Sequence, residues 1–193
     1  MYIPQHFEVT DKKEINSFIK ANAFGQLISK VDGRLFSTHL PVLLNDDGDQ
    51  LLGHIARTNP QWKQIDNQEV MVTLQGPHDY ISPSWYNSPG VPTWNYQAVH
   101  IYGKCLIIEE TYRLKQIVET LTAKFEATFD APWQPDYPAS MLRGIVGLEI
   151  AIGEIQCKYK LNQNRSDEDQ NRVIETLNAH GSHQLAKAMQ ENR

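Results

Sequence analysis

The sequence has little of what several large protein classes require. Only two of its 193 residues are cysteines, Cys105 and Cys157, and neither has a second cysteine or a histidine at metal-ligand spacing. No stretch approaches the run of about 18 apolar residues that a membrane-spanning helix needs. The first seven residues have no basic flank and no apolar run, so we expect no secretory leader. We therefore expect two buried, reduced thiols in a cytoplasmic protein without a membrane partner.

Basic residues are also in the minority. Lys and Arg total 18 and Asp and Glu total 23, which gives a formal charge of −5. A protein that lies on the nucleic-acid backbone is usually basic, so this balance argues against that class, although a local basic patch would be compatible with it.

The motifs of several enzyme classes are missing as well. There is no glycine fingerprint for a dinucleotide and no P-loop. The seven histidines form no metal-binding pair, and His180 and His183, on either side of a Gly-Ser turn, are weak as a metal motif. Ser82, Ser84 and Cys105 lack the flanking residues of a catalytic nucleophile. We expect no metal site and no catalytic residue of the hydrolase type.

Strand patterns joined by tight turns make up most of the chain. We expect strands over 24–31, 34–44, 51–56, 70–74, 94–108 and 145–155, the last continuing into 157–161. Asp32-Gly33 is typical of a hairpin turn. The segment 76–92 is rich in Gly, Pro and Ser but also aromatic, and we interpret it as a long structured loop.

Helices are expected at both ends of the chain and between strands. Asp11 or Thr10 caps the first helix, and a short helix starts at Pro60. A longer helix begins at about Glu110, with Leu114, Ile117, Val118, Leu121 and Phe125 on one face. Ser166 caps the next helix, and Gly181 separates it from the last. The predicted last pair packs Leu177, Leu185 and Met189.

These elements predict a mainly β fold with peripheral helices. Hairpin-linked strands in this number tend to close into a barrel, which removes exposed edges. We expect a barrel domain over residues 1–165 and a C-terminal helical hairpin over 166–193 packed on the same domain.

The segment 53–62 combines a strand end with a helix start. Asn59 and Pro60 suit the N-cap and first helical positions, and helix N-termini attract anions. Arg57 adds a guanidinium, and Thr58 a hydroxyl, so the segment predicts a phosphate cradle. The alternative is an ordinary capped helix with a surface arginine, which is more common for this feature alone.

Two further segments carry unusual side chains. Residues 80–86 hold three aromatic residues and residues 91–96 hold two, and these could frame a planar ring or instead lie in the core or at a dimer contact. The other segment is 158–165, in which Lys158 and Lys160 share one face of a strand and Arg165 follows. These cations would bind a phosphate or carboxylate, or would simply guard a solvated strand edge.

Taken together, these segments closely resemble the PaiB family, described as FMN-binding negative transcriptional regulators. The resemblance runs from the first residues to past Arg165, with one departure, since Asn162 stands where a serine is expected. The matching segments are 3–7, 39–41, 53–57 with 59–62, 80–86, 91–96, and 160–161 with 163–165.

The resemblance implies the split β-barrel of pyridoxamine-phosphate oxidases and flavin reductases, a homodimer, and FMN in the groove between two chains. It also implies a repressor role for protease and sporulation genes in some bacteria. The FMN-binding residues expected from it are His39, Arg57, Thr58, Asn59, Trp62, Ser84, Trp94, Asn95, Tyr96, Lys160, Gln163 and Arg165.

Three functions compete at this point. The protein is an FMN-responsive transcriptional regulator, a flavin-dependent oxidoreductase, or a flavin-binding module that regulates through a protein partner. Direct DNA binding would need a recognition helix, and the only candidate, 182–193, carries Lys187 and Arg193 against Glu191. We expect weak DNA binding. Because a flavin performs the redox chemistry itself, the lack of a catalytic acid or base leaves enzymatic activity open.

Overall fold

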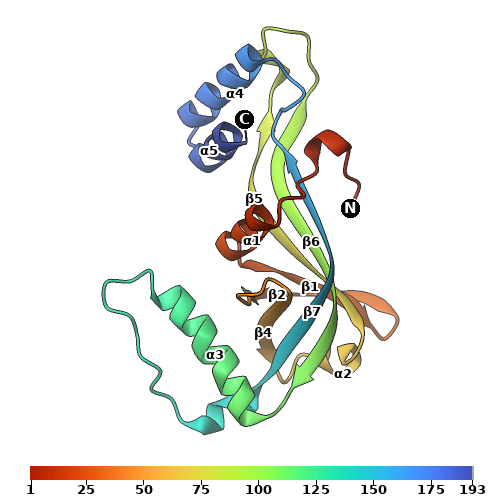
Figure 1. Ribbon diagram of the computed structural model, residues 1–193, viewed down its shortest axis with the longest axis vertical. Coiled ribbons are helices and arrows are strands. Elements are labelled where there is room, and N and C mark those ends of the chain that lie inside the picture. The colour runs from red at the N-terminus through yellow and green to blue at the C-terminus, as the bar shows by residue number, and fades with distance from the viewer. Residues whose placement is uncertain (193) are drawn as a thin grey trace. The chain divides into compact units, whose positions relative to one another are not determined.

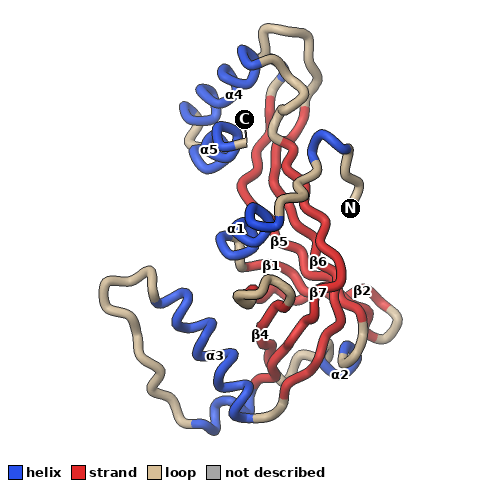
Figure 2. Tube along the Cα trace, viewed as in Figure 1, coloured by secondary structure: helices blue, strands red, loops and turns tan. Residues whose placement is uncertain are grey.

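The computed structural model describes residues 1–192 and is mostly antiparallel sheet with helices at its periphery (Figures 1 and 2). The helices are α1 (Lys12–Ala21), α2 (Trp62–Ile65), α3 (Thr111–Glu126), α4 (Asp167–Ala179) and α5 (His183–Glu191). The strands are β1 (Phe24–Val31), β2 (Arg34–Pro41), β3 (Leu43–Leu44), β4 (Gln50–Ala56), β5 (Glu69–Ile81), β6 (Thr93–Ile108) and β7 (Ile145–Lys160).

The first hairpin forms where the sequence predicted it. Asp32 and Gly33 join β1 to β2 with φ of 50° and 75°, the two left-handed residues that a tight hairpin turn requires. The returning strand is shorter than expected, because it breaks at Val42 before β3. The Val42 N–H leaves the ladder and donates to the carbonyl of Ala23 at 2.8 Å.

The seven strands follow the order β2-β1-β5-β6-β7-β4-β3. The strands β2 and β3 stand at opposite ends of this order, yet only Val42 separates them in the chain. Gly53 in β4 lies against β2, since a Cβ there would come within 3.3 Å of the Leu40 side chain and of the Pro41 carbonyl. The sheet therefore curls until its ends meet, and the expected mainly β fold is confirmed.

One strand is much longer than the sequence indicated. Residues 76–81, expected in a loop, continue β5 to Ile81, although the alternation of buried and more exposed side chains stops after Gly76. Gly76 and Pro77 are frequent loop residues, but here they lie inside the strand, and the next buried residue after Gly76 is Ile81, at the strand's end. Only the remainder, 82–92, connects β5 to β6.

The predicted helix caps are confirmed at two positions. The Asp11 carboxylate accepts the Glu14 N–H at 2.8 Å, and the Ser166 hydroxyl accepts the Asp169 N–H at 3.2 Å. In α3 the predicted face is buried at Leu114, Ile117 and Leu121, but Phe125 is exposed. Leu177, Leu185 and Met189 are buried in the α4–α5 hairpin, as predicted.

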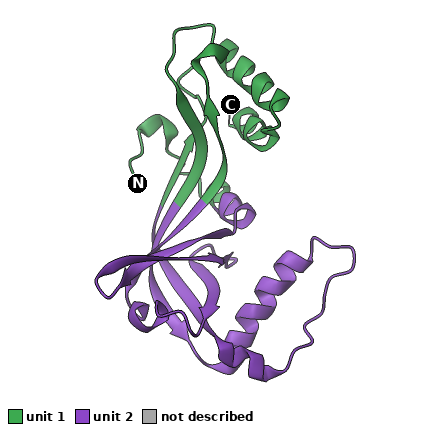
Figure 3. Cartoon of the chain, turned by 180° about the vertical axis from the view of Figure 1, so that it is seen from behind, with its two compact units in different colours: residues 1–15, 75–99, 156–193 green, residues 16–74, 100–155 purple. Residues whose placement is uncertain are grey.

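Two compact units make up the chain (Figure 3). Unit 1 consists of residues 1–15, 75–99 and 156–193, and unit 2 consists of 16–74 and 100–155. The α4–α5 hairpin belongs to unit 1, whereas the first hairpin, β4 and α3 belong to unit 2. The division into domains at residue 165 stays a prediction.

The two cysteines are buried and unpaired, as expected. Burial raises the pKa of each thiol to about 12, with smaller contributions from Asp66 for Cys105 and from Glu14 for Cys157. Within residues 1–192, no helix combines the length and the apolar character needed to cross a bilayer.

Candidate functional site

Arg57 lies just after β4 and is held by three neighbours within unit 2. Its Nη1 donates to the Glu109 carboxylate at 2.5 Å, Nε donates to the Arg143 carbonyl at 2.9 Å, and Nη2 donates to the Ile145 carbonyl at 3.2 Å. A guanidinium has five N–H groups, so two of them stay available for a ligand. Glu109, which follows β6, is a partner that the sequence did not indicate.

The turn after Arg57 differs from the expected helix start. The helix α2 contains only four residues and begins at Trp62, so Pro60 lies in the turn before it. Asn59 still caps this turn, because its side-chain oxygen accepts the Gln61 N–H at 3.0 Å. A single helical turn has a small dipole, and an anion here would depend mainly on Arg57 and on the exposed Thr58.

A buried polar network fixes this turn against β1 and β2. The fully buried Gln61 amide donates to the Ser29 hydroxyl at 2.9 Å and accepts from the Thr38 hydroxyl at 2.6 Å. Asn59 donates to the same Thr38 oxygen at 2.8 Å. Because every member has a partner in a region of low dielectric, the network makes the turn rigid. Gln61 was not among the predicted residues, since nothing in the sequence pattern distinguishes a buried glutamine.

Trp62 completes this group of side chains. Its indole Nε1 donates to the Arg57 carbonyl at 2.9 Å, and its ring lies 5.6 Å from the Arg57 guanidinium and 5.9 Å from the Lys63 ammonium. Each of the two cations lies close enough to the indole ring for a cation–π attraction. Lys63 is a further cation beside the turn, and it was not among the residues predicted from the sequence.

His39 projects from β2 on the exposed side of the sheet in unit 2. Its ring stacks on Phe24 with centroids 6.3 Å apart, and Phe24 is 64% exposed. In the antiparallel register Gln26 pairs with His39 and Phe24 with Pro41, so the two rings are diagonal neighbours on one face. Phe24 could have been predicted as a neighbour of His39 only if the register of β1 and β2 had been known.

In unit 1, Lys160 is tied to the start of β6. Its Nζ donates to the Thr93 hydroxyl and, at 2.7 Å, to the Trp94 carbonyl. Burial, and then the charge of Lys158, lower the pKa of Lys160. Trp94 itself is 54% exposed, with the Tyr80 ring edge-on at 6.1 Å and the His78 ring at 6.5 Å. Trp94 therefore lies outside the core and offers its ring to a ligand or a partner.

Lys158, by contrast, is buried, so the solvated strand edge considered for it is wrong. Its Nζ lies 5.3 Å from the Tyr96 ring, 5.6 Å from Tyr2 and 5.9 Å from Phe7, and it donates to the Tyr2 carbonyl at 3.1 Å. Asn95, the residue before Tyr96 in β6, is fully buried and donates to the Met189 sulfur at 3.4 Å. The Asn95 side-chain oxygen has no partner within residues 1–192.

The remaining predicted residues in unit 1 make hydrogen bonds within loops and turns. Gln163 closes a turn, because it accepts the Leu161 N–H at 2.7 Å and donates to the Tyr159 carbonyl at 2.6 Å. Arg165 lies 4.4 Å from the Tyr86 ring and donates to the Pro89 carbonyl at 3.0 Å. Ser84 is exposed and shares a hydrogen bond with Ser82.

Asn162, the one departure from the family pattern, has a local explanation. Its φ is +66°, a left-handed conformation that asparagine tolerates better than most residues. Its amide donates to the Tyr86 hydroxyl at 3.2 Å. The asparagine thus suits the backbone at this position and also binds the loop before β6.

The structure thus gathers the predicted residues into two groups. The group in unit 2 consists of Arg57, Thr58, Asn59 and Trp62 at the β4–α2 turn, together with His39 on β2. The group in unit 1 consists of Ser84, Trp94, Asn95, Tyr96, Lys160, Gln163 and Arg165. The described residues contain no cluster of three or more His, Cys, Asp or Glu side chains that could hold a metal.

A family model described as "Putative FMN-binding domain" matches residues 1–154. The chain belongs to this family. A Bacillus subtilis (strain 168) relative, "Protease synthase and sporulation protein PAI 2", is 44% identical over 185 residues, which cover 92% of this chain and 89% of the relative. An uncharacterized protein of Emericella nidulans is 31% identical over 209 residues, 83% of each chain. The resemblance to the PaiB family is confirmed.

Solved structures with the same fold are more distant in sequence. The flavocytochrome Anf3 from Azotobacter vinelandii has a TM-score of 0.66 at 15% identity, over 88% of this chain and 78% of its own. A FAD and heme binding protein from Mycobacterium smegmatis has a TM-score of 0.66 at 16% identity, over 84% and 78%. The fold is the flavin-binding split β-barrel that the sequence predicted.

Family membership makes FMN the cofactor, as predicted. The residues around the β4–α2 turn fit its phosphate, which is an acceptor-only dianion. Arg57 has two N–H groups without a partner among the described residues, and Thr58 offers an exposed hydroxyl. Charge-assisted hydrogen bonds of this kind are about twice as strong as neutral ones.

Proposed function

We propose that this protein is an FMN-binding regulator of the PaiB type, and that Arg57 and Thr58 contact the FMN phosphate. The observation that supports this role is the state of the Arg57 guanidinium. It is fixed by Glu109 and two carbonyl groups, so its direction is set before a ligand arrives. A side chain fixed in this way loses little conformational entropy on binding.

The other predicted residues are proposed to contact FMN as the family resemblance implies. Asn59 and Trp62 adjoin Arg57 in unit 2, and His39 lies on β2 of the same unit. The group in unit 1 offers an exposed indole at Trp94 and a half-buried ammonium at Lys160. When bound, FMN supplies redox chemistry, and the protein positions it and controls its surroundings.

We further propose a cytoplasmic homodimer that controls protease and sporulation genes. The support is the 44% identity to the Bacillus subtilis protein that is named for protease synthesis and sporulation. The exposed Trp94 suits a subunit contact, because large exposed aromatic side chains are enriched at interfaces.

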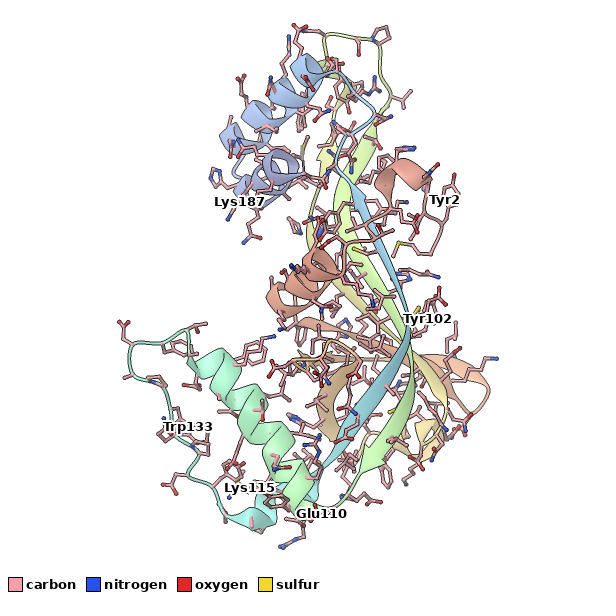
Figure 4. All side chains as sticks on the ribbon, in the orientation of Figure 1. Tyr2, Tyr102, Glu110, Lys115, Trp133 and Lys187 are labelled. Atoms are coloured by element: carbon pink, nitrogen blue, oxygen red, sulfur yellow. The ribbon has the colours of Figure 1, made fainter. Side chains whose placement is uncertain are left out.

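Direct DNA binding has weak support in the α4–α5 hairpin. The first turn of α4 carries the exposed Asp167 and Glu168, which would repel phosphates. On α5, Lys187 is exposed (Figure 4) and lies 3.6 Å from the Glu191 carboxylate, while Arg193 is outside the described residues. We therefore favour regulation through a protein partner over direct reading of DNA.

A flavin-dependent oxidoreductase is the second candidate. It is favoured by the similarity in fold to the flavocytochrome from Azotobacter vinelandii, at a TM-score of 0.66 over 88% of this chain. The sequence contains no signal for a particular substrate.

The experiment begins with the visible spectrum of the purified protein loaded with FMN, followed by NADH or NADPH under anaerobic conditions. For a regulator, we expect a stable oxidised flavin spectrum. Bleaching at a catalytic rate would instead support the oxidoreductase. A gel shift with promoter DNA, with and without FMN, then separates the two regulatory mechanisms. Tight, sequence-specific and steeply salt-dependent binding would contradict the proposed partner-mediated mechanism.

A further inference from the structure

His54 belongs to β4, in the segment that leads to Arg57, but it has no part in the proposed FMN site. Its Nδ1 is shielded from solvent and has no hydrogen-bond partner within residues 1–192. A buried ring nitrogen of this kind is costly, because it has lost its contact with water and gained no hydrogen bond in exchange. The cost grows if the ring takes up a proton, so it depends on what surrounds the ring.

The register of β4 and β7 places His54 beside α3. His54 pairs with Gly147 in the antiparallel ladder, so the two residues face the same side of the sheet. A Cβ at Gly147 would lie 3.1 Å from the side chains of Ile108 and Ile117 and 3.2 Å from that of Leu114. Leu114 and Ile117 are buried residues of α3. The missing side chain of Gly147 thus lets α3 approach the sheet next to His54.

Leu52 shows independently which face His54 occupies. It lies two positions before His54 in β4 and therefore on the same face of the strand. Leu52 packs in an apolar cluster with Ile117 and Leu121 of α3, and Figure 1 shows the helix alongside β4. A Cβ at Gly53, on the opposite face, would meet β2 instead. The half-buried His54 therefore lies between the sheet and the apolar side of α3.

The charged side chains of α3 and β7 near His54 are paired with one another. Arg113 of α3 donates to the Glu149 carboxylate of β7 at 2.5 Å. Lys115, which Figure 4 labels on the same helix, pairs with Glu119 at 3.6 Å. The strand β4 itself contains no charged residue. The Glu149 carboxylate is therefore already bound to a guanidinium and is not free for a protonated His54.

The segments next to these elements are engaged in the same way. Glu109, which follows β6, pairs with Arg57 at 2.5 Å. Glu110 caps α3, because its carboxylate accepts the N–H groups of Tyr112 and Arg113 at 2.8 and 2.7 Å. The residue Arg143, before β7, is exposed and adds only a further positive charge. Each carboxylate near this part of α3 thus already has a donor or a cation.

We propose that His54 is an acid-sensitive lock, whose neutral ring holds α3 on the sheet and whose protonation loosens the helix. A proton would bring a positive charge between apolar side chains, while the neighbouring carboxylates have other partners. Burial alone lowers the pKa of His54 from its ordinary value of 6.5, so the folded state disfavours the charged ring. The stability that the neutral ring contributes is fully present above 6.5 and is lost as the pH falls through the lower folded value.

The test is hydrogen exchange at the amides of α3 in the FMN-loaded protein, from neutral pH to about pH 5. Exchange chemistry itself depends on pH, so each wild-type rate is divided by the rate of the same amide in His54→Leu at the same pH. We expect this ratio to be constant above 6.5 and to rise several-fold below it. The amides of Leu114 and Ile117 should respond, whereas those of α4, in the other unit, should keep a constant ratio.

Two further variants control for other causes. His54→Gln keeps a polar side chain that takes up no proton, so it should behave as His54→Leu does. His183→Gln is the matched control, because it removes an exposed histidine from α5 and should keep the full acid response. Repeating the series without flavin should give the same ratios.

Three results would overturn the lock. The first is a wild-type ratio that stays constant over the whole pH range. The second is an acid response in His54→Gln as large as that of the wild type, since another group would then take up the proton. The third is a response that appears only with FMN bound, which would place the titrating group at the flavin. None of these results depends on whether Arg57 contacts the FMN phosphate.

Discussion

The ammonium of Lys158 lies 5.3 Å from the centroid of the Tyr96 ring, inside a group of three aromatic side chains. The other two rings, Tyr2 and Phe7, come from the N-terminal segment, and Figure 4 labels Tyr2 there. The same segment pairs with β7, because the Val9 N–H donates to the Cys157 carbonyl at 3.1 Å. A lysine with only 6% of its surface exposed thus holds the N-terminus of the chain on β7.

Replacement of Lys158 by Met should loosen this N-terminal segment. The variant loses the cation–π contacts and the hydrogen bond to the Tyr2 carbonyl, which together contribute about 1–3 kcal/mol to the free energy of unfolding. Urea unfolding measures the loss, and hydrogen exchange at the Val9 amide measures the loosening. Lys104→Met, at an exposed position of β6, should change neither quantity. Unaltered Val9 exchange in Lys158→Met would show that the aromatic group does not depend on the ammonium.

How far the sequence could predict the fold is clear from the first hairpin and from β5. Asp32-Gly33 determines a turn by local backbone preference, so β1 and the start of β2 were predictable. Gly76 and Pro77 also have local preferences, but the neighbouring strands override them and β5 continues to Ile81. Such tertiary effects are invisible in a pattern of single residues.

The candidate site shows the same limit. Arg57 was predictable because an arginine and a capping asparagine are close in the sequence. Its partner Glu109 is 52 residues away, so only the folded chain reveals the pair. Lys158 and Lys160 have the same sequence pattern, yet the first is enclosed by rings and the second is tied to Thr93. The packing of other elements around β7 makes this difference.

Asp169 should make the loop between β5 and β6 sensitive to acid. Its carboxylate accepts the Asn87 N–H at 2.7 Å and also binds the Ser88 hydroxyl, and these bonds lower its pKa, the Ser88 hydroxyl most. A lowered pKa in the folded state means that the contribution to stability is present above the ordinary value of 3.8. That contribution disappears as pH falls through the lower folded value.

We therefore expect Asp169→Asn to be less stable than the wild type at neutral pH, with the gap closing as the pH falls below 3.8. Thermal unfolding at several pH values between neutrality and strong acid measures the gap. Asp167→Asn, an exposed change in the same helical turn, is the control. A constant gap over the whole range would mean that the Asp169 charge has no part in holding the loop.

The two thiols should be inert in the native protein. Burial raises the pKa of Cys105 and of Cys157 to about 12, and only a thiolate reacts readily with disulfide reagents or alkylating agents. At pH 8 we expect no thiol to react with an aromatic disulfide reagent in native buffer and both to react in denaturant. Two substitutions to serine, one at a time, would assign any signal. Fast reaction of either thiol in the folded protein would contradict its burial.

Arg57 is the most direct test of the proposed FMN site, because the same side chain has a structural and a binding role. Its bonds to the carbonyl groups of Arg143 and Ile145 stabilise the chain, so Arg57→Ala should lower the free energy of unfolding by about 1–2 kcal/mol. Loss of the contact to the phosphate should weaken FMN binding about ten- to a hundredfold, since such a bond contributes about 1.5–3 kcal/mol. Flavin fluorescence quenching measures the affinity.

Riboflavin and Glu109→Gln separate these two roles of Arg57. Riboflavin lacks the phosphate, so its affinity should be almost the same for Arg57→Ala and the wild type. Glu109→Gln removes the carboxylate that offsets the Arg57 charge, and FMN affinity should stay the same or increase. Arg34→Ala, at an exposed position of β2, should affect neither ligand. Equal losses for FMN and riboflavin in Arg57→Ala would indicate a distorted site, because a missing phosphate contact changes FMN binding alone. If FMN binding is instead unchanged, the phosphate lies elsewhere, and Lys160 and Arg165 in unit 1 become the residues to replace next.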